Sequence, residues 1–357
     1  MKKLNLAIIG QGRSGKGIHG VYYRSKDNVY FNVKYVVDKD EYRRSVAEKD
    51  YPGCVTLADY RELFEHDDID LIVNASYSEL HYSISLDCLE HGYNVLVEKP
   101  MGATEYECQR LLATAEKNGV HIAAFQQSFY APYYTFASEL AKSGKIGEIL
   151  AVDVKFNGFS RRWDWQTLQK KTAGGLFNTG PHPVGLALGF LDFSSEAKVE
   201  YSKLAIGQTS GDGDDYAKVI LTAPGKPVVD VEVSSCDAFS NFNIKMQGSR
   251  GTARIDLGKC DLVYYTDEEN PRKEVIEASM SNDKGEPCYC SENLIKHVEE
   301  IKFNGGPFDV GTADLYREVY EMITEGKPMT FGAEIAMQVV KVIAEVHAHN
   351  PLPVKFL

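Results

Sequence analysis

The stretch Leu4-Asn5-Leu6-Ala7-Ile8-Ile9-Gly10-Gln11-Gly12-Arg13-Ser14-Gly15 decides the fold of the N-terminal part of the chain. The run Leu4–Ile9 predicts a buried strand, and three glycines follow it at once. Gly10 permits a tight turn, Gly12 lets a ligand approach the backbone, and Gly15 allows a helix to pack closely. The first N–H groups and the positive dipole end of that helix favour a pyrophosphate. The residues assigned to this phosphate site are Gly10, Gly12, Arg13, Ser14 and Gly15.

A second predicted strand, Phe31–Val37, is followed by Asp38, 23 positions after the last glycine of the loop. In dinucleotide-binding folds a carboxylate at this place accepts hydrogen bonds from the adenosine ribose. It repels the 2′-phosphate of NADP. The nearby cations Lys39, Arg43 and Arg44 keep binding of such a phosphate open as an alternative. The alternative is an exposed aspartate at a strand end. The sequence therefore favours NAD over NADP as cofactor.

The first third of the chain alternates β-branched runs with amphipathic stretches, which predicts parallel strands with helices on both faces. The helix over Glu105–Lys117 begins with a capping box, formed by Thr104 and Glu107, and ends at Gly119. We therefore predict a doubly wound parallel sheet, and a dinucleotide-binding domain over residues 1–125. Further strands are predicted over Ile69–Asn74, Asn94–Val97 and Val120–Phe125, and a further helix over Glu79–Glu90.

After residue 125 the pattern changes to consecutive strands joined by short turns, which predicts antiparallel pairing. Two such turns are Pro224–Pro227 and Gly248–Gly251. Residues 126–357 are therefore predicted to form a second domain, which also carries helices. Its predicted strands are Ile146–Gly158, Ala197–Gly207, Ala217–Ala223, Val228–Ser234, Asn243–Gln247 and Thr252–Leu257, and its helices are Pro132–Lys142, Asp309–Thr324 and Ala333–Ala348.

Composition excludes several classes of protein. With 357 residues the chain is long enough for two domains. A net charge of -12 argues against a nucleic-acid partner, since phosphate binding needs an excess of Lys and Arg. The longest apolar runs are too short for a membrane span or a secretory signal. The seven cysteines include the close pair Cys288 and Cys290, but lack a zinc-like spacing, so we expect no metal and a cytoplasmic protein with reduced thiols.

Two segments carry residues suited to catalysis. The fourth predicted strand ends in Val97-Glu98-Lys99-Pro100, and ligands of doubly wound sheets bind at the carboxyl ends of strands. A lysine there can steady a substrate hydroxyl or its developing oxyanion, although an isolated Lys-Pro is more often a surface turn. The second segment, Gly174–Pro183, places His182 among glycines and prolines at the start of a helix. The alternative is an ordinary histidine at a helix end.

Together these segments resemble the glucose–fructose oxidoreductase / inositol dehydrogenase / rhizopine-catabolism (Gfo/Idh/MocA) family, almost from end to end. The resemblance implies a Rossmann domain, and a C-terminal α/β domain whose open, mainly antiparallel sheet mediates a homodimer or homotetramer. It implies hydride transfer between NAD(P) and a hydroxyl of a sugar, cyclitol or related small molecule. By this analogy His182 accepts the proton, Lys99 is its electrostatic partner and Asn178 is the third polar group. The cofactor contacts implied beyond the glycine loop and Asp38 are Asn74, Ser76, His81, Glu98, Lys99 and Gln126.

The sequence departs from the family pattern at several places. The usual D-x-G-x-H-x-x-D reads as Asn178–Gly185, so both acidic positions are neutral. Ser76-Tyr77-Ser78 stands where many relatives have Thr-Pro-Asn. The segment Arg161–Trp165 is rich in sugar-binding residue types, or is a loop anchored by its tryptophans. The substrate contacts assigned are Lys99, Arg161, Trp163, Trp165, Asn178 and His182.

Two other functions stay open at this point. The same site could use NAD only transiently, to ease elimination or glycoside cleavage at a neighbouring carbon. Some relatives instead bind the dinucleotide and a protein partner as non-enzymatic regulators. Retention of both Lys99 and His182 argues against the second alternative.

Overall fold

The computed structural model describes residues 2–356, which carry two sheets. The first sheet has six strands in the order β3-β2-β1-β4-β5-β6, and every neighbouring pair is parallel. This is the strand order of a Rossmann fold, and it reverses between β1 and β4, where such sheets bind ligands. The predicted doubly wound sheet is therefore confirmed. Its strands are β1 (Leu4–Ile9), β2 (Phe31–Val37), β3 (Val55–Leu57), β4 (Leu71–Asn74), β5 (Val95–Val97) and β6 (Ile122–Ala124).

The helices of this part begin with an irregular one. The glycine loop leads into the π-helical turn Gly15–His19 before α1. At α4 the Thr104 side chain accepts the N–H of Glu107, as predicted, and Gly119 ends the helix with a φ of 66°. The Glu107 carboxylate, however, accepts the N–H of Ala103 rather than that of Thr104, so only half of the predicted capping box forms. The helices are α1 (Gly20–Tyr23), α2 (Glu41–Asp50), α3 (His81–Glu90) and α4 (Glu105–Asn118).

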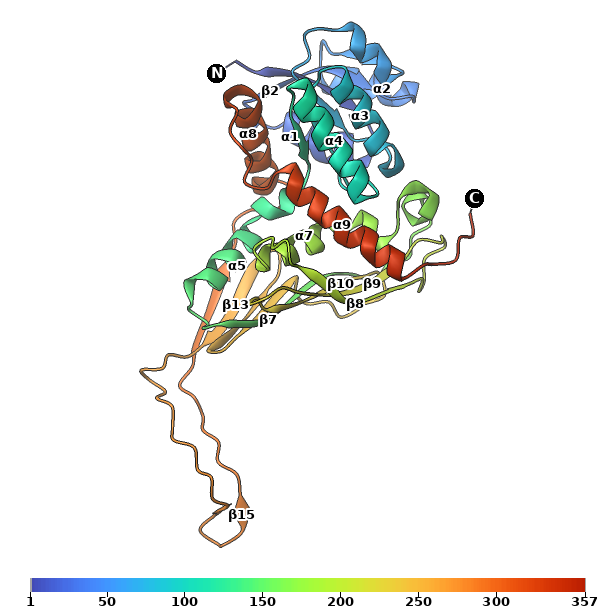
Figure 1. The fold of residues 1–357 in the computed structure, drawn as a ribbon. Coiled ribbons are helices and arrows are strands. Elements are labelled where there is room, and N and C mark those ends of the chain that lie inside the picture. The colour runs from blue at the N-terminus through green and yellow to red at the C-terminus, as the bar shows by residue number, and fades with distance from the viewer. Residues whose placement is uncertain (1, 357) are drawn as a thin grey trace.

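The second sheet has eight strands in the order β16-β13-β12-β11-β7-β10-β9-β8. Its neighbours are antiparallel except β7 and β10, which are parallel, so the sheet is mainly antiparallel as expected. Between β13 and β16 an extended arm with β14 and β15 projects from the body (Figure 1). Association of copies through this sheet stays a prediction. The strands are β7 (Ile149–Asn157), β8 (Lys198–Ala205), β9 (Tyr216–Thr222), β10 (Val228–Ser234), β11 (Ile244–Gly248), β12 (Gly251–Ile255), β13 (Lys259–Tyr264), β14 (Met280–Ser281), β15 (Pro287–Cys288) and β16 (His297–Lys302).

The last two helices return to the N-terminal part of the chain. Figure 1 shows α8 beside the first sheet and α9 running between the two sheets. The Tyr316 ring of α8 is fully buried, 5.3 Å from the ring of Phe31 in β2. The division into domains at residue 125 stays a prediction. The remaining helices are α5 (Pro132–Ser143), α6 (Gly175–Asn178), α7 (Pro181–Phe190), α8 (Val310–Glu325) and α9 (Ala333–His349).

Residues 2–356 carry neither a membrane-spanning helix nor a cluster of metal-binding side chains. None of the helices there has both the length and the apolar character needed to cross a bilayer. In the same residues no three His, Cys, Asp or Glu side chains gather as a metal site would require. The seven cysteines are free thiols.

Candidate active site

The glycine loop after β1 is shaped by close contacts. Gly10 has a φ of +93°, and a Cβ there would lie 2.5 Å from the carbonyl oxygen of Ala75. A Cβ at Gly15 would overlap the carbonyl oxygen of Gly10. At Gly12, by contrast, a Cβ would meet no atom within 4 Å. The loop thus needs two of its glycines for its own packing and leaves the third open to a ligand. This cradle fits the pyrophosphate of a dinucleotide.

Asp38 lies beside this loop at the end of β2. One oxygen of its carboxylate accepts the N–H of Gln11 at 2.8 Å, and the other accepts the N–H of Asp40 at 2.9 Å. Arg43 Nη1 is 3.6 Å from the first oxygen. A carboxylate offers about four acceptor sites, so Asp38 keeps capacity for two hydroxyl donors. The side chain therefore orders the loop and remains available to a ribose.

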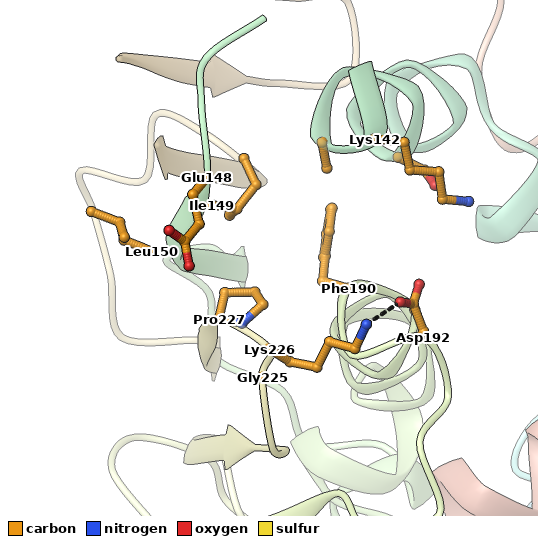
Figure 2. A pocket seen from close by; sticks show the side chains of 12 residues that line it. Lys142, Glu148, Ile149, Leu150, Phe190, Asp192, Gly225, Lys226 and Pro227 are labelled. Carbon is orange, nitrogen blue, oxygen red and sulfur yellow. Dashed lines mark hydrogen bonds and ion pairs between the residues drawn. The ribbon is translucent and has the colours of Figure 1, made fainter. Parts of the chain in front are cut away.

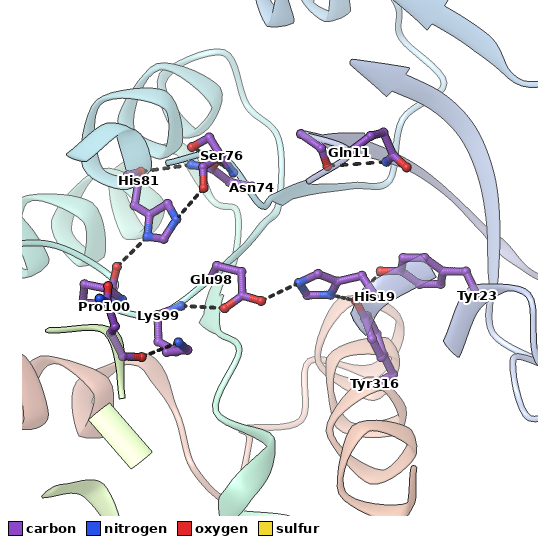
Figure 3. A network of polar contacts seen from close by, with 12 residues as sticks. Gln11, His19, Tyr23, Asn74, Ser76, His81, Glu98, Lys99, Pro100 and Tyr316 are labelled. Carbon is purple, nitrogen blue, oxygen red and sulfur yellow. Dashed lines mark hydrogen bonds and ion pairs between the residues drawn. The ribbon is translucent and has the colours of Figure 1, made fainter. Parts of the chain in front are cut away.

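A buried polar network reaches the end of β5 from α8 (Figure 3). Glu98 Oε1 lies 3.2 Å from His19 Nε2, and Oε2 accepts the backbone N–H of Lys99 at 3.2 Å. The other ring nitrogen of His19 lies 2.6 Å from Tyr316 Oη, which also accepts the hydroxyl of Tyr23. Burial alone would raise the pKa of Glu98, but His19, with Lys99, holds it at about 2. Glu98 is therefore an ionised anchor for the Lys99 backbone, and its contact with the cofactor stays a prediction.

Asn74 and His81 form a second set of contacts on the same edge of the sheet. Asn74 is fully buried; its amide donates to the carbonyl of His81 and to Ser85 Oγ, and its oxygen accepts Ser76 Oγ–H at 2.7 Å. His81 Nδ1 lies 2.8 Å from the carbonyl oxygen of Pro100. Burial lowers the pKa of His81 and so favours the neutral ring. Asn74 and His81, predicted as cofactor contacts, therefore hold the loops around the cofactor site.

Lys99, Asn178 and His182 come together although they belong to separate elements. The Lys99 amine donates to the backbone carbonyl of Asn178 at 2.6 Å. Burial lowers the pKa of Lys99, and the nearby cations Arg13 and Arg162 lower it further against the opposing effect of Glu98. Burial, with the Lys99 charge, lowers the pKa of His182 to about 3. The imidazole is thus neutral at physiological pH and lies within the field of the lysine.

Asn178 contacts Lys99 through its backbone and not through its side chain. Its backbone carbonyl, and not its amide, accepts the Lys99 amine. The side-chain Nδ2 donates to the carbonyl of Gln166 at 2.6 Å instead. The role of Asn178 as the third polar group of the site stays a prediction. The contact depends on the path of the chain at the end of α6.

The segment before α6 lies differently from the expectation for a sugar-binding loop. The Trp163 side chain is 79% exposed, and the Trp165 ring packs edge-on against Tyr77, 4.9 Å between centroids. A cavity of about 250 Å³ adjoins Asn178, and from this segment Arg162 and Gln166 line it. Asp164 caps the short helical turn that begins at Trp165 by accepting the N–H of Gln166. Arg161, Trp163 and Trp165 are not among the residues that line the cavity.

The amino-acid sequence matches one family over most of its length. Residues 4–147 match an oxidoreductase family with an NAD-binding Rossmann fold, and residues 134–254 match the GFO/IDH/MocA C-terminal domain. The chain belongs to the GFO/IDH/MocA family. The resemblance inferred from the motifs is thereby confirmed, and the Rossmann part is that of an NAD-binding family.

Relatives within the GFO/IDH/MocA family are distant in sequence. The 2,7-anhydro-N-acetylneuraminate hydratase of Mediterraneibacter gnavus is 23% identical over 264 residues, which cover 73% of this chain and 69% of that protein. The scyllo-inositol 2-dehydrogenase (NADP(+)) of Bacillus subtilis is 24% identical over 187 residues, 52% and 51% of the two chains. The crystal structure of a 3-ketoreductase from Actinomadura kijaniata, with NADP and TDP-benzene, has a TM-score of 0.79 at 16% identity and 98% coverage of both chains. GenD2 from gentamicin A biosynthesis, in complex with NAD, has a TM-score of 0.76 at 21% identity, covering 97% of this chain and 93% of that one. The two solved structures share the fold.

A larger cavity of about 460 Å³ lies elsewhere in this GFO/IDH/MocA chain (Figure 2). It lies between α5, the start of β7 and the turn Gly225–Pro227. Lys142, Phe190 and Asp192 are among its lining residues. The residues that line it include none of Lys99, Asn178 or His182. The volume of a cavity therefore does not indicate where Lys99, Asn178 and His182 lie.

Three residues of this family site were not predicted from the sequence. Ser128 Oγ lies 2.8 Å from His182 Nδ1, and Ser128 follows β6 closely, so the rule that ligands meet strand ends could have found it. His19 and Tyr316 are joined although 297 positions separate them, and no local pattern signals that contact.

Gln126, which was predicted as a cofactor contact, is buried just after β6.

Proposed function

We propose that this chain transfers a hydride between NAD and a hydroxyl-bearing carbon of a sugar, cyclitol or related small molecule. One observation carries the proposal. The Lys99 amine donates to the backbone carbonyl of Asn178, four residues before His182, and its charge lowers the pKa of the His182 imidazole at the carboxyl end of the Rossmann sheet. Arg13 of the glycine loop is close enough to lower the pKa of that lysine, so the pair and the dinucleotide cradle share one site.

The chemistry divides between the two side chains. Bound NAD supplies the hydride acceptor. As the carbon loses its hydride, the neutral His182 takes the hydroxyl proton, and the Lys99 ammonium donates a hydrogen bond to the oxygen that becomes a carbonyl. Negative charge on the substrate oxygen raises the pKa of the imidazole while the proton moves. Ser128 Oγ lies at Nδ1, so we assign the resting ring proton to Nδ1, which donates it to Ser128 and leaves Nε2 free to take the substrate proton.

The pH dependence of oxidation follows from the two lowered pKa values. His182 stays neutral above a pH of about 3, so its protonation gives kcat/KM no acidic limb near neutrality. Lys99 loses its charge as the pH rises through a pKa below 10.5, so the rate falls there. In Lys99→Arg this basic limb moves to higher pH, because the guanidinium keeps its proton. Rate profiles of both proteins with one substrate test this; a basic limb unchanged by the substitution would remove Lys99 from the assignment.

Cofactor preference depends on Asp38 in this account. The carboxylate accepts ribose hydroxyls and repels a 2′-phosphate, so NAD(H) binds more tightly than NADP(H). Asp38→Ser narrows the difference, because it removes the repulsion and frees Arg43, now 3.6 Å from the carboxylate, for a phosphate. Titrations of both cofactors against both proteins measure it. Tighter binding of NADP(H) by the unaltered chain would overturn this role.

A transient use of NAD is the second candidate, and the hydratase relative favours it. The same Lys99 and His182 could oxidise one carbon, allow elimination or addition at the next, and reduce the first again. Such a reaction yields product without net NADH. A regulator without catalysis is disfavoured, because both side chains are retained and meet.

Turnover with a panel of sugars and cyclitols tests the proposal. The full chain is incubated with NAD and each compound, and NADH and new products are both measured. Net NADH supports the dehydrogenase, and product without NADH supports the transient reaction. Lys99→Ala serves as the control for each active compound. If no compound gave either signal above that control, the proposed function would fall.

A further inference from the structure

Loops from the two parts of the chain meet beside the cofactor site. Tyr77 and Glu79 follow β4, whereas Trp165 and Lys171 lie in two short helical turns before α6. The Lys171 amine donates to Glu79 Oε1 and lies over the Tyr77 ring, 5.2 Å from its centroid. The Trp165 ring packs edge-on against the same tyrosine, with 4.9 Å between centroids. We call these four side chains the clasp.

The contacts of the clasp are weak enough to open. The Lys171 side chain is 34% exposed, and Tyr77 is 45% exposed. Ion pairs and cation–π contacts at such partly exposed sites contribute little stability. Glu79 Oε2 is buried and lacks a hydrogen-bond partner among residues 2–356, so this carboxylate depends on Lys171. The clasp can therefore open without unfolding of either part.

The side of the clasp that comes from the C-terminal part is held from behind. Asp212 is fully buried, and its carboxylate accepts the backbone N–H groups of Gln169 and Lys355 at 2.9 Å each. The Gln169 amide donates to the backbone carbonyls of Asp212 and Pro353. Lys171 therefore reaches across to the loop after β4 from a fixed base.

The clasp lies between the two ends of the cofactor site. On one side the backbone of Ala75 abuts the glycine loop, since a Cβ at Gly10 would lie 2.5 Å from the Ala75 carbonyl oxygen. On the other side the Gln166 carbonyl accepts the amide of Asn178, whose own carbonyl binds the Lys99 amine. The loops that carry the clasp thus contact both the phosphate cradle and the lysine of the reaction site.

We propose, building on the oxidoreductase function above, that the clasp holds the two parts of the chain closed around bound NAD(H) and limits the rate at which the cofactor leaves. Lys171 and Trp165 are positioning residues, because they act through the loop after β4. Trp165, which the sequence places among the substrate contacts, thus acts on the cofactor.

The test is the release of NADH from the full chain in the absence of substrate. The loaded protein is mixed with an excess of NAD, and the loss of bound NADH is followed by its fluorescence. Lys171→Met and Trp165→Ala should each release NADH about two- to fivefold faster, as expected for the loss of one partly exposed contact. The double variant should release it faster than either. The melting temperature should fall by no more than about 4 °C in each single variant.

Reversal of the charges separates the ion pair from a general loosening of the loops. Glu79→Lys alone should release NADH faster, because two cations then face each other. Adding Lys171→Glu should slow the release again, since opposite charges are restored. The matched control is Lys226→Met: the Lys226 side chain is 35% exposed and pairs with Asp192 at 2.5 Å, but this pair lies within the C-terminal part. It should leave the release rate unchanged.

The inference is overturned if Lys171→Met or Trp165→Ala leaves NADH release unchanged, if the control speeds release as much, or if the reversed pair is no slower than Glu79→Lys alone. Faster release with a larger fall in melting temperature also overturns it. Turnover is scored separately with the panel of compounds. Altered release without turnover counts against the oxidoreductase alone, and turnover with unaltered release counts against the clasp alone.

Discussion

Lys99→Ala and His182→Ala are each expected to lower turnover by about 10²–10⁴-fold, while NAD(H) affinity stays within a few-fold. The rate falls because one variant loses the cation at the developing oxyanion and the other loses the proton acceptor. Affinity persists because backbone groups of the glycine loop hold the pyrophosphate. Steady-state kinetics with the best compound of the panel, and cofactor titration by fluorescence, measure the two quantities.

Asn178→Ala is the matched control for these variants. The Lys99 amine is bound by the backbone carbonyl of Asn178, which the substitution keeps. We therefore expect the control to lose far less activity than Lys99→Ala. If Asn178→Ala were as inactive as Lys99→Ala, the lysine would depend on the amide side chain, contrary to the contact described. If Lys99→Ala or His182→Ala kept most of the activity of the unaltered chain, the substituted residue would have no catalytic role.

Glu98→Ala is expected to destabilise the protein by about 1–3 kcal/mol, the usual effect of leaving buried hydrogen-bonding groups without their partner. His19 would lose the acceptor 3.2 Å from its Nε2, and the Lys99 N–H would lose its carboxylate. Glu98 is a positioning residue for Lys99, so kcat should fall with KM little changed. Denaturant unfolding and kinetics measure both effects. Glu116→Ala, at an exposed site on α4, serves as the control and should stay within about 0.5 kcal/mol.

The pH dependence of this stabilisation has a definite sign. The folded-state pKa of Glu98 is about 2, below its ordinary value of 4.5. Its contribution is therefore complete above pH 4.5 and is lost as the pH falls towards 2. The difference in stability between the unaltered chain and Glu98→Ala should shrink over that range. A difference no larger than that of Glu116→Ala at neutral pH would show that the network is dispensable.

The parts of this site that could be predicted are those that depend on a short stretch of the sequence. The glycine spacing and the apolar run before it place β1 and the cofactor loop, and the bounds of β1 and β2 agree with the prediction to the residue. Lys99 could be placed because it follows a buried strand, and the carboxyl ends of such strands share one edge. These inferences needed only short-range pattern and a general rule of topology.

The parts that could not be predicted depend on distant contacts or on weak patterns. β3 has only three residues, and β16 has just two apolar residues, Val298 and Ile301, separated by two adjacent glutamates. The glutamates of β16 form ion pairs with Lys145 and Lys259 on the surface, so no apolar run signals the strand. Tyr316 reaches His19 only because α8 folds back onto the first sheet. Asn178 acts through its carbonyl, which every residue has.

The central claim is that hydride passes between NAD and a hydroxyl-bearing carbon beside Lys99 and His182. Its most direct test uses the best compound of the panel, deuterated at each ring carbon in turn, with NAD and the full chain under single-turnover conditions. Mass spectrometry then measures deuterium in the nicotinamide. We expect one deuterium in NADH from one carbon position, and none with Lys99→Ala or His182→Ala at matched times. Product formed without deuterium entering the nicotinamide from any position would contradict it.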